Sequence, residues 1–314
     1  MKNKSNGRVR PSWIVASACA AGLAGCGGGG GGSDAGGLPM LPVLPAAAPA
    51  SAPAPAPAPA PEPNRDPMPG SEPLPSLDAP QAGSTAAAGN DSEGIYASLL
   101  DITLIGADGS IASKDHIGTM WGSLTVTGLD WSFNPDTAYY FIDASPVTGS
   151  GTFTPKKVMN GTYSWDQRAP SAFGPQKYAV ENALAVSQDS VTGKWANPDS
   201  NYGVGLSIEV DATGAFTGKT AGVQVGDCSI SGVLAQAQPG TSKNMYGFAL
   251  NAVDAGIDGK NACKLSTNRP YRGPAAIVLV PAGAYEGNGY FRRVFFLVKT
   301  DNGATLTASL QKQP

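Results

Sequence analysis

The chain has 314 residues, with 21 basic and 24 acidic side chains, and its net charge at neutral pH is −3. Residues 1–25 hold four Lys or Arg and no Asp or Glu, so the chain that follows them carries a charge of −7. No cluster of basic residues occurs after this segment. Because proteins bind nucleic acid through Lys and Arg that neutralise phosphates, the composition excludes a nucleic-acid partner and also excludes attachment to anionic lipid through a basic surface.

The N-terminal segment has the pattern of an export signal. A basic leader precedes the apolar stretch 13–24, which at about 12 residues is too short for the ~20 that cross a bilayer. The stretch ends in Leu23-Ala24-Gly25-Cys26, which resembles a bacterial lipobox. In lipobox proteins the cysteine is acylated and the chain is cut before it. We therefore expect a signal peptide over 1–25, palmitate-type acylation of Cys26, and anchorage to the bacterial cell envelope, in the outer membrane.

Residues 26–90 predict a disordered stalk. The glycines at 27–32 are followed by an Ala-Pro alternation over 46–61 and then by more Pro, Ser, Gly and Ala. Proline removes backbone donors, and Ala and Gly offer little apolar area to offset the entropy of ordering. Ala-Pro repeats favour extended polyproline II, so the linker is interpreted as a spacer. A proline-rich recognition segment for an aromatic groove is the alternative.

Residues 91–314 predict an all-β domain. Apolar residues alternate with a period of two, as in Leu206-Ser-Ile-Glu-Val210, and turn signals such as Asn302-Gly303 separate the runs. The runs 275–280 and 294–298 are continuously apolar, which is typical of strands buried on both faces. We expect an antiparallel sandwich or a barrel-like body.

A weak internal repeat divides this domain into possible halves at 91–177 and 178–314. The pattern of aromatic strand, strand, turn and two strands over 94–125 is echoed over 193–232. The repeat predicts two tandem β-meanders, each unable to close its edges alone, that pair into one body.

Two cysteines remain in the expected domain after Cys19 leaves with the signal and Cys26 carries lipid. Cysteine pairs in exported domains usually form disulfides, so we expect Cys228 and Cys263 to close a loop worth roughly 3 to 4 kcal/mol. The alternatives are a metal site and a reactive thiol. A zinc site needs further ligands, and His116 is the single histidine of the chain. We expect no metal and no cofactor.

The C-terminal part combines an aromatic strand, a Gly-rich hairpin, two cysteines and an Asn-x-Tyr strand. These features lie in Gly193-Lys-Trp195, Gly214-Ala-Phe-Thr-Gly218, Cys228-Ser-Ile-Ser-Gly232, Asn244-Met-Tyr246, Cys263 and Tyr271-Arg-Gly273-Pro-Ala-Ala276. In this pattern the chain is similar to a recurrent domain of proteobacterial lipoproteins of uncharacterised function. The resemblance implies no ligand and no catalytic residue.

Catalytic motifs are absent from the sequence. No Gly-x-Ser-x-Gly, His-Glu-x-x-His or Walker pattern occurs, and no dinucleotide-binding glycine pattern follows a strand. His116 lies in a polar segment that predicts a solvated turn. We therefore expect a binding or structural role and no enzyme. The alternative is a carbohydrate-active hydrolase, which needs two facing carboxylates, such as Glu181, Glu209 or Glu286 with an aspartate.

Aromatic residues supply the candidate binding surface. Trp131, Tyr139 and Tyr140 flank a polar loop and are expected to be half exposed, and Tyr285 and Glu286 lie in a Gly-rich loop. A protein or a glycan is the expected ligand.

Overall fold

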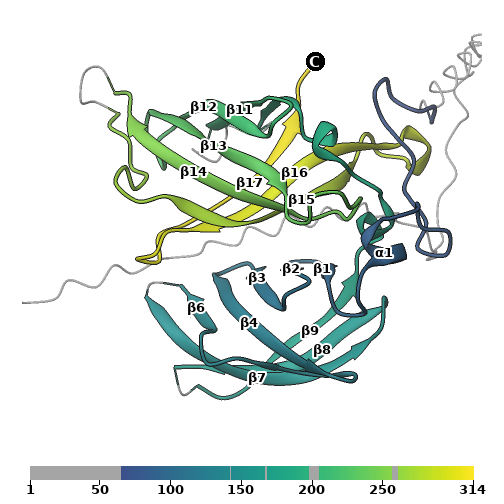
Figure 1. Cartoon of the computed structure of the whole chain (residues 1–314). Coiled ribbons are helices and arrows are strands. Elements are labelled where there is room, and N and C mark those ends of the chain that lie inside the picture. Colours follow the sequence, from purple (N-terminus) through teal and green to yellow (C-terminus); the bar gives the residue numbers. More distant parts are fainter. Residues whose placement is uncertain (1–64, 142, 167, 198–204, 257–260) are drawn as a thin grey trace, which may run out of the picture. The chain divides into compact units, whose positions relative to one another are not determined.

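The computed structural model describes residues 65–314, apart from 142, 167, 198–204 and 257–260. The predictions for the signal peptide, for Cys26 and for the glycine and Ala-Pro runs fall outside the described residues. Residues 61–314 form one compact unit. Almost all of its regular structure is strand (Figure 1), and none of the helices in the described part is long and apolar enough to span a membrane.

The first nine strands form one closed antiparallel sheet (Figure 1, blue to teal). They are β1 (Gly94–Ala97), β2 (Ile102–Ile105), β3 (Ser110–Lys114), β4 (Thr119–Thr127), β5 (Asp130–Phe133), β6 (Ala138–Tyr140), β7 (Ala144–Thr154), β8 (Val158–Trp165) and β9 (Ser171–Tyr178). The sheet runs from β3 through β1, β9 and β7 to β4, and the pairing of β3 with β4 closes the ring. Both β5 and β6 pair with β4 on one side and with β7 on the other, at different positions along these strands. They therefore occupy one position in the ring, and eight positions surround the interior.

The last eight strands form a second barrel (Figure 1, green to yellow). They are β10 (Gly193–Ala196), β11 (Gly205–Val210), β12 (Ala215–Ala221), β13 (Cys228–Gln236), β14 (Tyr246–Asp254), β15 (Tyr271–Pro281), β16 (Tyr290–Lys299) and β17 (Thr305–Lys312). Each strand pairs with the next, and β10 pairs with β17 at Trp195 and Lys312. Short helices lie outside the strands: α1 (Thr85–Ala88), and 3-10 turns at Val180–Ala183, Gln188–Ser190 and Glu286–Asn288.

The prediction of an all-β domain with a barrel-like body is confirmed, but the meanders close differently from expectation. Each half closes its own ring, through β3 with β4 in the first and β10 with β17 in the second. The expectation that neither half could close alone was therefore wrong. Pairing between the first and last strands of a meander is long-range, and a period-two pattern carries no information about it.

Side chains fill both barrel interiors. In the second barrel Phe248 stacks between Phe216 and Phe296, with ring centroids 5.0 and 4.4 Å apart, and Trp195 is fully buried. In the first barrel Trp131 packs against Phe133 and Phe173, among other buried aromatic residues. Eight strands enclose only enough space for inward side chains of this size.

The two barrels pack against each other through their outer walls. Strands β15 and β16 are apolar on both faces: Phe296 points into the second core, while its neighbour Leu297 packs with Ala112 and Trp121 of the first barrel. Ala276 packs likewise with Ile95 and Leu104. The prediction that the runs 275–280 and 294–298 are buried on both faces is confirmed, because the second face of each strand covers the neighbouring barrel.

Residues 65–90 are part of the folded unit, which corrects the expected domain start at residue 91. Glu72 forms a β-bridge with Tyr290, and its carboxylate accepts hydrogen bonds of 2.5 and 2.8 Å from Arg292. Ser84 caps helix α1, in which Thr85 is buried. These contacts are backbone bonds, a cap and an ion pair, so a search for apolar periodicity does not detect them.

The predicted disulfide is confirmed. Cys228, at the start of β13, bonds to Cys263 with a sulfur–sulfur distance of 2.08 Å and a Cα–Cα distance of 4.9 Å. Both alternatives for this pair, a metal site and a reactive thiol, are thereby excluded in the structure.

Candidate binding site

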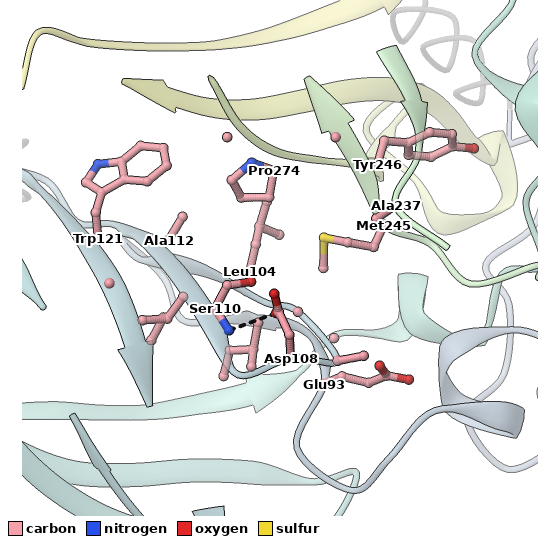
Figure 2. A pocket seen from close by; sticks show the side chains of 18 of the residues that line it. Glu93, Leu104, Asp108, Ser110, Ala112, Trp121, Ala237, Met245, Tyr246 and Pro274 are labelled. Carbon is pink, nitrogen blue, oxygen red and sulfur yellow. Dashed lines mark hydrogen bonds between the residues drawn. The ribbon is translucent and has the colours of Figure 1, made fainter. Parts of the chain in front are cut away.

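A pocket of about 730 Å³ lies between the outer walls of the two barrels (Figure 2). One wall comes from β2, β3 and β4 and the turns around them, and the other comes from β14, β15, the end of β16 and the residues ahead of β14. The pocket exists because two convex barrel walls touch over only part of their surfaces.

The middle of the pocket is apolar. Leu104 and Ala112 line it from the first barrel, and Met245 and Pro274 line it from the second. Figure 2 shows Ala112, Leu104 and Pro274 side by side, with Trp121 next to them. Trp121 is 6% exposed, and its Nε1–H has no acceptor among the described residues. An apolar middle of this kind favours the non-polar part of a ligand.

Two carboxylates line one side of the pocket. Asp108 accepts a hydrogen bond of 3.0 Å from the backbone N–H of Ser110, drawn in Figure 2, and Asp136 accepts one of 2.8 Å from the hydroxyl of Ser123. Ser110 and Ser123 are direct partners in the β3–β4 ladder. Both aspartates are exposed. The hydrogen bonds from Ser110 hold the pKa of Asp108 below its ordinary value, so this group is ionised at neutral pH.

The basic residues of the pocket have different surroundings. Lys299 lies over the ring of Tyr140, with its Nζ 5.5 Å from the ring centroid. Lys243 forms an ion pair of 2.5 Å with Glu93, which is 3% exposed and also accepts a hydrogen bond from the N–H of Asn90. The Glu93–Lys243 pair is therefore neutral, and Lys299 has no ion pair in the described part of the chain.

A buried asparagine holds the pocket wall in place. The side chain of Asn244 donates to the carbonyls of Ile277 and Glu181 and accepts from the N–H of Ile277, at 2.8, 3.1 and 2.9 Å. Its backbone N–H donates to the hydroxyl of Thr85. Asn244 thus links β15 to the segment between the barrels. In the Asn-x-Tyr motif the asparagine is structural, the following Met245 lines the pocket, and Tyr246 also fills the second core.

The aromatic residues predicted to form a binding surface lie in different parts of the structure. Tyr140 lines the pocket. Trp131 and Tyr139 are 2% and 1% exposed and belong to the first core, so the prediction that they are half exposed is wrong. Trp131 donates its Nε1–H to the carbonyl of Asn160. Strands β5 and β6 are too short for the sequence to show which of their residues point inward.

Tyr285 and Glu286 lie in the connection between β15 and β16 and do not line the pocket. Tyr285 is 38% exposed, and the guanidinium of Arg65 lies 5.3 Å from its ring centroid. This connection also holds the N-terminal segment, because the side chain of Asn288 donates to the carbonyl of Asp66. It serves as an attachment point for residues 65–72.

The hydrolase alternative gains no support from its glutamates. Glu181, Glu209 and Glu286 do not line the pocket, and the carboxylate of Glu181 accepts a hydrogen bond from the N–H of Leu279. His116 is exposed in the turn between β3 and β4, which confirms the prediction of a solvated turn residue. Within the described ranges, no group of three or more His, Cys, Asp or Glu could hold a metal ion.

Sequence reasoning missed most of the pocket. The local sequence marks Asp108 only as part of an Ala-Asp-Gly turn and Asp136 only as part of an Asn-Pro-Asp loop. Trp121 and Pro274 come from different barrels, and no local signal relates them. No family model, no curated protein and no solved structure matches this chain.

Proposed function

We propose that this protein is a lipid-anchored component of the bacterial cell envelope that binds a ligand in the pocket between its two barrels. The anchor is Cys26 of the lipobox-like segment, and the support for it is the N-terminal sequence. The observation that carries the binding role is the pocket itself. Its volume falls in the range of small-molecule sites, and it combines apolar walls with a few charged side chains.

Binding is favoured over hydrolysis by the ionisation of the pocket carboxylate Asp108. A glycosidase needs one carboxylic acid whose pKa is raised, so that it can donate a proton at neutral pH. The pKa of Asp108 is shifted in the opposite direction by its hydrogen bonds with Ser110. Glu93 is held by Lys243 and by the N–H of Asn90. Asp108 is therefore suited to recognising a charged group, whereas the charge of Glu93 is already balanced by Lys243.

The proposal is tested by filling the pocket. Gly247 on β14 lines it, and a Cβ added there would meet nothing closer than the carbonyl of Ala235 at 4.0 Å. Gly247→Trp should therefore fold normally and occupy the pocket. Val253→Trp is the matched control, because Val253 is on the same strand, 62% exposed and outside the pocket.

The neutral probe N-phenyl-1-naphthylamine, which fluoresces on entering an apolar site, reports occupancy. We expect the wild-type protein and Val253→Trp to bind it alike and Gly247→Trp to lose at least about tenfold in affinity, since the indole removes the apolar surface that the probe would cover. Equal binding by all three proteins, or no binding by any of them, would contradict the proposal.

A further inference from the structure

We propose, building on the proposed function, that the ligand of this pocket is a small amphipathic cation: a molecule with an ammonium or guanidinium group beside an apolar body. No motif in the sequence assigns this ligand class. It follows from how the charges are distributed along the pocket.

The negative end is built from a ladder pair. Ser110 and Ser123 face each other across β3 and β4, and each donates a hydrogen bond to one aspartate. Residues that are direct partners in an antiparallel ladder lie about 5 Å apart at Cα. Asp108 and Asp136 are thus held on the same side of the pocket, both exposed and both free of a basic partner within the described residues.

The positive charge lies at the other end. Tyr140, under the ammonium of Lys299, belongs to the β4–β6 pairing opposite Thr119. Thr119 precedes Ser123 by four residues on β4, and four residues of strand at about 3.3 Å each span roughly 13 Å. The ring under Lys299 thus starts from a backbone position roughly 13 Å along the strand from Ser123, and Lys299 is not among the groups that shift the pKa of Asp108.

The ion pair between Glu93 and Lys243 contributes no net charge to the pocket, because the two side chains neutralise each other. The remaining charges that line the pocket are two carboxylates and one ammonium, that of Lys299 over Tyr140. Between them lie Leu104, Ala112 and Pro274, which offer apolar contact beside the carboxylates. A cationic group at Asp108 and Asp136, with its apolar body over these residues, complements both features.

Two probes with the same ring and opposite charge test the inference. Tryptamine carries an ammonium and indole-3-acetate carries a carboxylate, so calorimetric titration with each at low ionic strength isolates the effect of charge. We expect tryptamine to bind at least about tenfold more tightly, a ratio that should fall with added salt because the carboxylates are exposed. The double variant Asp108→Asn/Asp136→Asn should bind the two probes alike.

Asp130→Asn/Glu209→Gln is the charge-matched control, because it removes the same two charges at exposed positions, on β5 and β11, that do not line the pocket; it should keep the wild-type preference. Equal affinities for the two probes in the wild-type protein, or a preference for indole-3-acetate, would overturn the ligand class. If the neutral probe still binds in that case, the pocket remains the binding site and only the charge assignment fails. If neither indole probe binds, the ligand class is overturned as well.

Discussion

The indole of Trp121, on the first barrel, lies directly against the backbone of Gly273, on the second. A Cβ added to Gly273 would lie 2.8 Å from Cη2 and from Cζ3 of the indole, and it would also collide with the carbonyl of Leu297. The absence of a side chain at position 273 is what allows the two barrel walls to meet beside the pocket. This close approach forms one boundary of the apolar middle.

We predict that Gly273→Ala destabilises the protein by about 1–3 kcal/mol, because the added methyl group forces the indole or the strand to move. The free energy of unfolding in urea measures the effect. Gly247→Ala is the control, since its Cβ would have open space, and it should change stability by less than about 0.5 kcal/mol. If both substitutions changed the stability by the same small amount, the two barrel walls would not be in close contact at Gly273 and Trp121.

Residues 65–90 should contribute measurably to stability. A chain that starts at residue 61 should melt at the same temperature as one that starts at residue 27. A chain that starts at residue 91 should melt at least about 4 °C lower, because it loses the hydrogen bonds that Arg292 donates to Glu72 and that Asn244 donates to Thr85. Calorimetry of the three chains decides this. Identical melting of the third chain would mean that the segment rests on the barrel without stabilising it.

Glu72→Gln tests the ion pair alone. Arg292 has a raised pKa, chiefly because it donates hydrogen bonds to Glu72. Because the pair is half exposed, we expect a loss of about 0.5–1 kcal/mol that shrinks at high salt. Urea denaturation at low and high ionic strength measures it, with Glu209→Gln, an exposed position on β11, as the control. A loss that does not depend on salt would show that shape, and not charge, holds this contact.

The disulfide between Cys228 and Cys263 should stabilise the second barrel by roughly 3–4 kcal/mol, since it closes a loop of 35 residues in the unfolded chain. The double variant Cys228→Ser/Cys263→Ser should unfold at a correspondingly lower urea concentration. Its binding of the neutral probe under native conditions should be unchanged, because neither cysteine lines the pocket. Loss of binding at full stability would indicate that the disulfide shapes the site.

Alkaline pH should unfold the protein. Tyr96, Tyr178 and Tyr246 have pKa values raised above the ordinary 10.0, in each case chiefly by burial. Their neutral forms are favoured in the folded state, so this contribution is fully present below pH 10 and is lost as the pH rises above it. Near-ultraviolet absorbance of tyrosinate should therefore increase together with loss of the β signal in circular dichroism. Ionisation of all tyrosines before unfolding would contradict this.

Acylation of Cys26 is the prediction that concerns the anchor. Mass spectrometry of the mature N-terminus should find a lipid-modified cysteine, and Cys26→Ala should move the protein into the soluble fraction, because no basic surface replaces the lipid. An unmodified N-terminus at another residue would contradict it. Protease treatment of intact cells then shows which side of the outer membrane carries the domain: release indicates the cell surface, and protection indicates the periplasm.

The strands and their burial could be predicted from the sequence wherever the strands were long enough. The run 294–298 indicated two buried faces, and the structure explains both: one faces the second core and one faces the first barrel. Whether Trp131 and Tyr139 point into the barrel or away from it could not be predicted, because β5 and β6 contain only four and three residues.

The pocket could not be predicted at all. It depends on how two closed barrels meet: Asp108 lies in the β2–β3 turn of the first sheet and Gly273 on β15 of the second, and packing of the two barrel walls brings them to the same cavity. Residues 65–90 were missed for a related reason. Their contacts are polar and few, and they leave no apolar pattern in the sequence. The content of proline, serine and alanine therefore predicted disorder for the whole segment.

The filled interiors of the barrels have a consequence for how such a protein can diversify. On β4 Met120 belongs to the first core, while the next residue, Trp121, lines the pocket. On β14 Phe248 belongs to the second core, while the preceding Gly247 lines the pocket. Neighbouring residues on these strands thus point to a barrel core and to the pocket in turn. Substitutions at outward positions that do not carry the contact between the barrels, such as Gly247, can therefore change what is bound while both barrel interiors stay filled.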